Sequence, residues 1–374
     1  MDYNLRDRAW IWLNSAVGTN VRLADELIFI NDGLLPLFDS VRKGKPIRLP
    51  ASSGESLLDT LKKRSDDRSI DAAISKLDSI GAAAVTRDNA DYPNLLREIY
   101  DPPTVLFVKG KLKSSIRLPI AVIGSRKCSD YGRSMAERFG RELAKKGACV
   151  ISGMAEGCDS AAALGALSVK VAEYPTIAVL GSGIDVVYPS SNRKLYDAIA
   201  ERGAVISELS PGKRPSRESF PQRNRLISGM SKGVLVAEAG LKSGTSITVG
   251  FAHDQGRDVF AVPGRITDIM SAGSNQLIKQ GAAKAVFGVD DILFEYGVFV
   301  IPEEPKKEKS VLSDLSPKQK MIYEELMLGE KTADFLCEKL GFDVSEINIY
   351  LTEMELSGII NRLQNGSYSI QSRT

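Results

Sequence analysis

Short apolar runs rich in β-branched residues recur along residues 116–298, and glycine-containing turns and longer stretches of helical periodicity lie between them. Strands that are apolar on both faces and separated by helices are typical of a parallel sheet with helices on both sides. We therefore predict an α/β fold with a doubly wound, mostly parallel sheet in a domain of residues 91–298. The strands are expected at residues 119–123, 148–151, 176–180, 204–206, 233–237, 258–262 and 284–287.

Helical periodicity dominates the chain on either side of this domain. Residues 1–90 predict a small helical, SAM-like domain, and a short strand at residues 104–108 is expected in the connector that follows. Residues 299–312 are charged and contain prolines, which favours a linker. Residues 313–374 predict three short helices closed by a hairpin with an Asn365-Gly366 turn, an order typical of a winged-helix domain.

The composition is that of a globular protein with several domains: 374 residues, of which 43% are hydrophobic and 26% charged. No run approaches the roughly 18 apolar residues of a membrane helix, and the first residues lack the layout of a signal peptide. We therefore expect a cytoplasmic protein without a membrane partner. His253 is the single histidine, and the four cysteines form no C-x-x-C pair, so we expect no metal site, no cofactor and no histidine-based triad.

The six residues Phe220-Pro221-Gln222-Arg223-Asn224-Arg225 stand out just ahead of a predicted strand. Residues 211–225 carry five cations and one anion, a net charge of +4, whereas the whole chain carries +2. Guanidinium groups bind phosphate oxygens in pairs, and a phenyl ring offers a stacking surface to any base. The segment indicates a single-stranded nucleic acid, but a solvated or ion-paired loop with a buried phenylalanine fits the same residues equally well.

Glycines and small polar residues follow the predicted strands at four places. Because the carboxyl ends of parallel strands meet at one edge of a sheet, these turns are expected to line a common crevice, where helix N-termini direct amide groups at an anion. The turns are Gly124-Ser125-Arg126, residues 152–157, residues 181–183 and Ser243-Gly244-Thr245-Ser246.

Six motifs in order make the chain resemble the DNA-processing protein A family, also called DprA or Smf, most clearly over residues 92–287. They are residues 123–126, residues 152–159, residues 181–185 with Tyr188-Pro189, residues 220–225, residues 243–248 and residues 256–264. The resemblance implies a Rossmann-like domain that binds and protects single-stranded DNA and promotes loading of the RecA recombinase during natural transformation. It also implies a homodimer formed through that domain, and no catalysis.

The resemblance also assigns candidate DNA contacts. Arg126 and Arg217 match positions that grip phosphate, Phe220 matches the position that stacks a base, and the turn of residues 243–246 is expected to leave its amides free for a phosphate oxygen. Gly153 is expected to allow close backbone approach or to form a tight turn. For Arg225, bracing of the crevice is favoured over direct contact. The full set is Gly124, Ser125, Arg126, Gly153, Arg217, Phe220, Arg223, Asn224, Arg225, Ser243, Gly244, Thr245 and Ser246.

The chain departs from the family pattern at Ala163, where the family commonly has histidine. The main alternative function is a Rossmann-like protein that binds or hydrolyses small nucleotides, because related folds carry similar turns at this edge. Hydrolysis would need paired carboxylates, and the candidates Glu156, Glu208 and Glu238 form no clear pair and are explained more simply as partners of the arginines.

Two further classes of function are less well supported. The turn after the first predicted strand of the sheet lacks the Gly-x-Gly-x-x-Gly fingerprint of dinucleotide enzymes. Residues 313–374 hold ten acidic and six basic side chains, whereas a helix that enters duplex DNA needs several cations. A protein-contact or regulatory role is therefore favoured for that domain.

Overall fold

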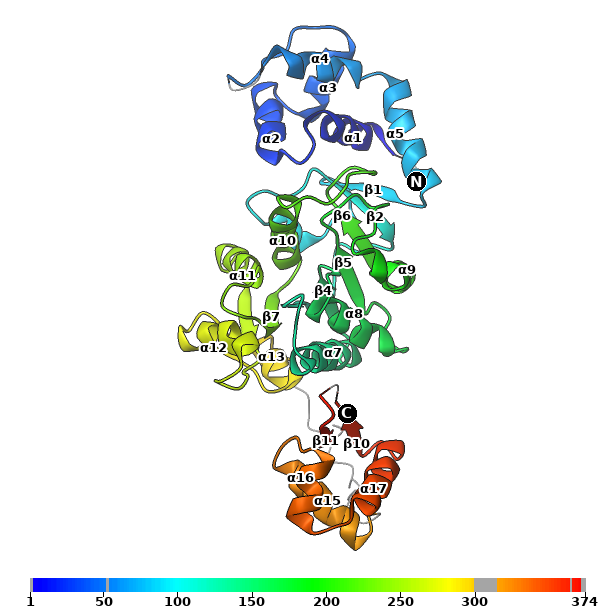
Figure 1. Ribbon diagram of the computed structural model, residues 1–374. Helices are drawn as coiled ribbons and strands as arrows, with labels where there is room; N and C mark the ends of the chain where they lie inside the picture. Colours follow the sequence, from blue (N-terminus) through cyan, green and yellow to red (C-terminus); the bar gives the residue numbers. More distant parts are fainter. Residues whose placement is uncertain (1–2, 52–53, 299–314, 364, 371–374) are drawn as a thin grey trace. The chain divides into compact units, whose positions relative to one another are not determined.

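The computed structural model describes residues 3–51, 54–298, 315–363 and 365–370 (Figure 1). The chain forms two compact units that divide after Val298. Each unit has an apolar core of its own. The linker expected at residues 299–312 lies outside the described residues.

A nine-stranded sheet forms the centre of the described part of the first unit. In sheet order its strands are β1 (Ala83–Thr86), β2 (Val105–Gly110), β6 (Ala204–Ser207), β5 (Thr176–Val179), β4 (Cys149–Ser152), β3 (Pro119–Gly124), β7 (Gly233–Glu238), β8 (Asp258–Ala261) and β9 (Lys284–Ala285). The run from β6 to β9 is parallel throughout, and its central strands are buried along their length. The prediction of a mostly parallel α/β sheet is therefore confirmed.

Two antiparallel strands extend the sheet beyond β6. β2 pairs with β6, and β1 pairs with β2. The helical expectation for residues 1–90 is therefore wrong at Ala83–Thr86, and the strand expected in the connector belongs to the sheet. Four residues are too few to display a strand period in the sequence, and β1 is specified by the pairing edge that β2 offers.

Helices cover both faces of the sheet, which makes it doubly wound. On one face α7 (Asp130–Lys145), α8 (Cys158–Ser168) and α9 (Arg193–Arg202) pack in sequence, and on the other α10 (Ser219–Gly229) contacts α11 (Thr245–Asp254) (Figure 1). Ala163 is fully buried in α8. The unit ends with a 3-10 turn (Ile269–Ser271), α12 (Ala272–Lys279) and α13 (Val289–Glu295); a second 3-10 turn (Ser190–Asn192) precedes α9.

The N-terminal helices share a core with the β1–β2–β6 side of the sheet. Trp12 is fully buried, lies 5.0 Å from Phe38 between ring centres, and donates its indole N–H to the carbonyl of Leu61 at 2.9 Å. The same apolar cluster includes Ala178 and Val205 of the sheet. The helices are α1 (Leu5–Val17), α2 (Val21–Ile30), α3 (Leu34–Arg42), α4 (Glu55–Lys63), α5 (Asp67–Ser79) and, after β1, α6 (Asn94–Arg97).

The second unit contains three helices and a hairpin in its described part. Ser316 begins the first helix with a capping box, in which its Oγ and the side chain of Gln319 exchange hydrogen bonds with each other's amides. The elements are α15 (Pro317–Met327), α16 (Ala333–Leu340), α17 (Val344–Leu356), β10 (Ile360–Arg362) and β11 (Tyr368–Ile370). This is the expected order of elements, and the assignment to a winged-helix domain stays a prediction.

The described residues include no helix with the length and apolar character that a membrane crossing needs, and they hold no cluster of three or more His, Cys, Asp or Glu side chains arranged to bind a metal.

Candidate nucleic-acid interface

A groove opens at the carboxyl ends of the parallel strands, between β3 and β7. The chain leaves β3 through α7 toward β4 and leaves β7 through α11 toward β8, so the two connections diverge and a crevice remains between them. The groove has a volume of about 500 Å³ and is lined by the turns after both strands and by the first turns of α10. Its exposed cations are Arg126, Lys127 and Lys242.

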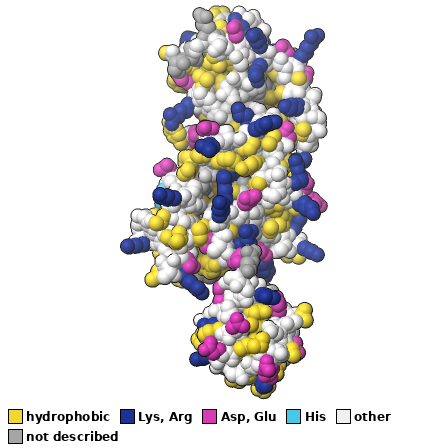
Figure 2. Space-filling model, in the orientation of Figure 1, with side chains coloured by type: hydrophobic (Ala, Val, Ile, Leu, Met, Phe, Trp, Pro, Cys, Tyr) yellow, Lys and Arg dark blue, Asp and Glu magenta, His cyan; other side chains and the backbone are white. Residues whose placement is uncertain are grey.

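Basic and apolar side chains lie together on the surface of the first unit. Figure 2 shows Lys and Arg side chains beside exposed hydrophobic side chains in the region where Figure 1 places α10. Such a mixture suits a ligand that combines negative charge with apolar rings.

Arg126 and Phe220 separate the groove from a smaller pocket, because both residues line both cavities. The guanidinium carbon of Arg126 lies 4.8 Å from the centre of the Phe220 ring, which is a cation–π distance. The ring of Tyr188 lies 5.6 Å from that of Phe220, tilted by 44°. Gly181 lets the Phe220 ring approach, since a Cβ at this glycine would come within 2.8 Å of the ring. The smaller pocket has a volume of about 60 Å³.

The Phe220-to-Arg225 motif is helical and not a loop ahead of a strand, because it forms the first turns of α10. Ser216 and Ser219 exchange hydrogen bonds between their hydroxyls and amides at 3.0 and 3.2 Å where the helix begins. Pro221 is tolerated because amides of the first turn have no partner within the helix. The helical period places the side chains three and four positions after Phe220 on its side of the helix, and turns Arg225 away.

Arg223 is buried beneath the pocket and bonded to the backbone. Its guanidinium donates to the carbonyl of Gly153 at 2.8 Å and to the carbonyl of Val179, and its Nε donates to Asn224 at 3.2 Å. Burial lowers the pKa of Arg223 to about 10, so the group stays charged at neutral pH. A Cβ on Gly153 would lie 2.5 Å from the guanidinium, and Gly153 has no positive φ. Gly153 therefore lets the Arg223 side chain pack against the turn after β4, and a turn that requires a positive φ does not explain this glycine. Close approach of a DNA backbone to Gly153 stays a prediction.

Asp159 completes this buried cluster. Its carboxylate accepts a hydrogen bond from the amide of Gly153 at 2.9 Å. Burial raises the pKa of Asp159, and the nearby charge of Arg223 opposes that rise. Arg223 and Asp159 thus hold the turn after β4 against α10, which fixes the position of the small pocket.

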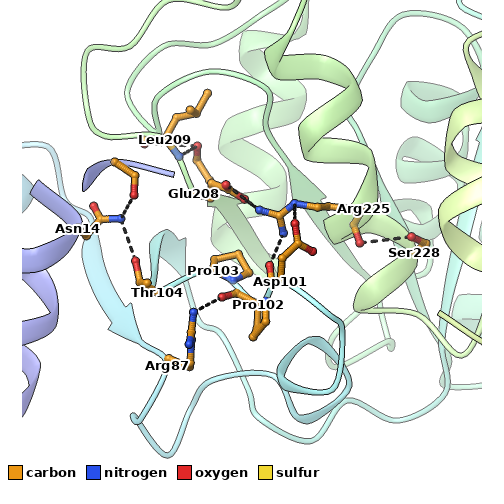
Figure 3. A network of polar contacts seen from close by, with 12 residues as sticks. Asn14, Arg87, Asp101, Pro102, Pro103, Thr104, Glu208, Leu209, Arg225 and Ser228 are labelled. Carbon is orange, nitrogen blue, oxygen red and sulfur yellow. Dashed lines mark hydrogen bonds and ion pairs between the residues drawn. The ribbon is translucent and has the colours of Figure 1, made fainter. Parts of the chain in front are cut away.

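Arg225 braces α10 from its other side (Figure 3). Its Nη2 donates to the two carboxylate oxygens of Glu208 at 2.8 and 2.6 Å, its Nη1 donates to the carbonyl of Asp101 at 2.9 Å, and its Nε lies 3.2 Å from the Asp101 carboxylate. The Arg225 and Glu208 side chains are each 8% exposed. Burial raises the pKa of Glu208 to about 7, although the charge of Arg225 acts in the opposite direction. This geometry agrees with the bracing role favoured from the sequence.

The turn of residues 243–246 leads into α11, but most of its amides are already bonded. The amide of Thr245 donates to Ser243 Oγ at 3.3 Å, and the amide of Ser246 donates to the Ser243 carbonyl at 3.3 Å. Small hydroxyl residues often satisfy nearby amides in this way. Within the described residues, Gly244 has the one amide of this turn without a partner. The expectation that the whole turn presents free amides is therefore wrong.

Most of the predicted contact residues come together at the groove. Arg217 is exposed ahead of α10, and Arg217, Arg225 and Ser246 lie outside the residues that line the two cavities. The smaller pocket is lined by Gly153, together with Arg126, Phe220 and Arg223. The groove is lined by Gly124, Ser125, Arg126, Phe220, Arg223, Asn224, Ser243, Gly244 and Thr245.

Sequence reasoning missed two cations of the groove, and it assigned arginine partners to two acids, Glu156 and Glu238, that have other neighbours. Lys127 directly follows Arg126, and Lys242 directly precedes the 243–246 turn, so a search for cations beside the crevice turns would have found both. Glu238 accepts hydrogen bonds from the amide and the hydroxyl of Ser129 at 2.7 and 2.5 Å, which hold the start of α7. It pairs with no arginine in the described part of the chain. Glu208 pairs with Arg225, as the sequence predicted. Glu156 is the one of these three acids that lines the small pocket.

Comparison with known proteins identifies the family. The family model for DNA recombination-mediator protein A matches residues 83–297, which starts at β1 and extends just past α13. Protein Smf of Escherichia coli (strain K12) is 36% identical over 309 residues, which cover 80% of each chain. DNA processing protein DprA of Streptococcus pneumoniae is 45% identical over 206 residues, which cover 55% of this chain and 71% of that protein.

Solved structures agree with the sequence comparison. The crystal structure of DprA from S. pneumoniae superposes with a TM-score of 0.65 at 33% identity and covers 79% of this chain and 99% of that one. DNA processing protein A from Helicobacter pylori, whose structure is described as revealing a unique single-stranded DNA binding mode, superposes with a TM-score of 0.51 at 29% identity, over 57% of this chain and 95% of that one. The resemblance read from the six motifs is therefore confirmed, and the chain belongs to the DNA recombination-mediator protein A family.

Proposed function

We propose that the groove between β3 and β7 binds single-stranded DNA, with Phe220 as the surface on which one base stacks. The observation that carries this proposal is the pair of Arg126 and Phe220, an exposed guanidinium over an aromatic ring at the divergence of two strand connections. Lys127 and Lys242 supply further cations for phosphates. The single-strand binding described for the H. pylori relative supports the same reading.

Binding requires Arg126 to leave the face of the Phe220 ring. An exposed cation–π contact contributes about 0.5 to 1 kcal/mol, whereas a base stacked on an aromatic side chain contributes about 1 to 3 kcal/mol. Exchange of the guanidinium for a base is therefore favourable, and it frees Arg126 to bind a phosphate. The movement also connects the groove with the small pocket, since Arg126 lines both.

Fluorescence anisotropy with a labelled thirty-nucleotide single strand tests this function. We expect binding that weakens as salt rises, weaker binding of the corresponding duplex, and no measurable competition by nucleoside monophosphates at comparable concentrations. Arg126→Ala should reduce the affinity, and Arg68→Ala, which removes an exposed arginine of α5, should not. Tight binding of a monophosphate without binding of the strand would favour the small-nucleotide alternative instead.

The cellular role that follows is protection of incoming single strands and promotion of RecA loading, without catalysis by this chain. Glu238 and Glu208 are engaged by Ser129 and Arg225, which leaves no carboxylate pair poised to activate water among the described groove residues. In a RecA strand-exchange assay on strands coated with single-strand binding protein, the wild type should shorten the lag and Arg126→Ala should not. Unchanged lag with the wild type would contradict the RecA role while leaving strand binding intact.

Self-association through the Rossmann-like domain forms part of the same proposal. Ile266 and Ile269 are 96% and 83% exposed in the segment after β8, and Leu241 is 64% exposed in the neighbouring turn after β7. Exposed apolar side chains grouped in this way are typical of protein interfaces. Light scattering should give the mass of a homodimer, and Ile266→Asp should reduce that mass to a monomer.

We propose that the second unit contacts a protein partner, because its excess of acidic side chains disfavours DNA. Strand binding should therefore survive deletion of residues 301–374. We propose that the protein acts in the cytoplasm together with RecA.

A further inference from the structure

Glu156 is an acid in the wall of a site otherwise built from cations and aromatic rings. It lies in the turn after β4 and lines the small pocket together with Arg126, Phe220 and Tyr188. Its side chain is exposed, and it forms no ion pair with any residue that the structure describes. The contact recorded for its carboxylate is a long hydrogen bond from the hydroxyl of Ser191 at 3.5 Å.

The other acids near the groove have structural tasks, and Glu156 does not. Glu208 and Glu238 accept two short hydrogen bonds each and hold α10 and α7 in place. A carboxylate without such partners beside a phosphate-binding surface weakens the binding of phosphates through like-charge repulsion. From its position in the pocket, the Glu156 carboxylate can therefore bind only a part of the ligand that donates hydrogen bonds.

The shape of the pocket identifies that part of the ligand. Pockets that enclose a whole small molecule measure roughly 300 to 1,000 Å³, whereas this one measures about 60 Å³ and opens beside the rings of Phe220 and Tyr188. A base stacked on Phe220 can insert one edge here, while its sugar and phosphate stay outside. Proteins that accept an unstacked base read its Watson–Crick edge in this manner.

We propose that Glu156 makes this pocket a base-edge site that selects guanine from the strand. Guanine presents its N1–H and 2-amino N–H side by side, and the two carboxylate oxygens can accept both as charge-assisted hydrogen bonds. Thymine presents one N–H between two carbonyl oxygens, which the carboxylate repels. Adenine and cytosine present an amino group without an adjacent ring N–H. The inference rests on the proposed strand binding and adds a preference that phosphate contacts and stacking alone do not produce.

Fluorescence anisotropy with three labelled fourteen-nucleotide strands tests the preference. The strands are alternating thymine–guanine, alternating thymine–hypoxanthine, and thymine alone. A lithium buffer prevents the guanine strand from forming quadruplexes. Because the purine occurs at every second position, a purine can reach the pocket wherever the strand binds along the groove. Hypoxanthine keeps the purine ring and N1–H but lacks the 2-amino group, so it controls for stacking. We expect the guanine strand to bind about five-fold or more tightly than the hypoxanthine strand, as a good bidentate contact implies.

Glu156→Gln keeps the size of the side chain and removes its charge. It should bring the guanine-to-hypoxanthine ratio close to one, while affinity for the thymine strand is kept or rises. Glu201→Gln, an exposed glutamate of α9 away from the cavities, should keep the wild-type ratio. A wild-type ratio near one, or a ratio that persists in Glu156→Gln, overturns the inference even if every strand binds well. Failure of all three strands to bind overturns the proposed function itself.

Discussion

The guanidinium of Arg126 rests over the ring of Phe220 although the two residues are 94 positions apart in the chain, one in the turn after β3 and the other in the first turn of α10. The strand order of the sheet brings them together, because the chain continues from β3 to β4 on one side and later returns to β7 on the other side of β3. The aromatic ring of Phe220 and the positive charge of Arg126 therefore lie at the same point of the groove.

Removal of the ring tests the stacking surface. Phe220→Ala should reduce single-strand affinity by about 1 to 3 kcal/mol, the usual contribution of one stacked base. Phe29→Ala is the matched control, since this ring is 84% exposed on α2 and lines neither cavity. Anisotropy titrations of both variants, with circular dichroism to verify folding, give the comparison. Equal affinities for the two variants would exclude Phe220 from the site.

Arg225 should affect stability more than it affects contact with DNA. Arg225→Ala removes a buried partner of Glu208 and Asp101 and should lower the free energy of unfolding of the first unit by about 3 kcal/mol or more. Lys113→Ala breaks the exposed pair with Glu173 and should change it by about 1 kcal/mol or less. Urea denaturation measures both. Similar values for the two variants would show that the Arg225 network does not brace α10.

The network should also make stability depend on pH. Burial raises the pKa of Glu208 from its ordinary 4.5 to about 7, with Arg225 opposing and Asp101 adding to the rise, so the folded protein holds this proton more tightly than the unfolded chain does. The resulting stabilisation is complete below about pH 4.5 and is lost as pH rises through about 7.

Glu208→Gln should remove that dependence. Relative to this variant, the wild type should lose up to about 3 kcal/mol between about pH 4.5 and about pH 8. Parallel stability curves for the two proteins over this range would mean that Glu208 does not titrate as its burial requires.

Two glycines should respond to alanine with opposite signs. Gly153→Ala places a methyl group 2.5 Å from the guanidinium of Arg223, which its backbone bonds hold in place, and should destabilise the protein by about 1 to 3 kcal/mol. Gly250→Ala meets no atom within 4 Å in the exposed middle of α11 and should stabilise by about 0.5 to 1 kcal/mol. Thermal unfolding distinguishes them, and a neutral Gly153→Ala would contradict the close packing of Arg223.

The sheet could be predicted because its central strands are buried on both faces and are therefore continuous apolar runs. β1 could not, since four residues display no period and the edge of β2 specifies their conformation. The helical start of α10 was hidden by Pro221 and by polar residues, and the bonds between Ser216 and Ser219 stabilise it locally. The composition and spacing of the residues indicate neither the pairing of β1 with β2 nor the hydrogen bonds between Ser216 and Ser219.

The site was predictable at the level of turns but not at the level of single side chains. Arg126 and Phe220 follow from turn position and residue type. Arg223 and Arg225 belong to the same short motif as Phe220, yet both are buried, because their partners Gly153, Glu208 and Asp101 come from distant segments. Lys127 and Lys242 could have been found from their places beside the crevice turns.

Photochemical cross-linking locates the strand on the protein most directly. A single strand that carries 5-iododeoxyuridine, which cross-links to stacked aromatic side chains on irradiation, is bound, irradiated and digested with trypsin. Cleavage after Arg217 and Arg223 releases residues 218–223, the peptide that contains Phe220. We predict that the main adduct lies on Phe220 in this peptide. Adducts confined to the N-terminal helices or to the second unit, with none on residues 218–223, would contradict it.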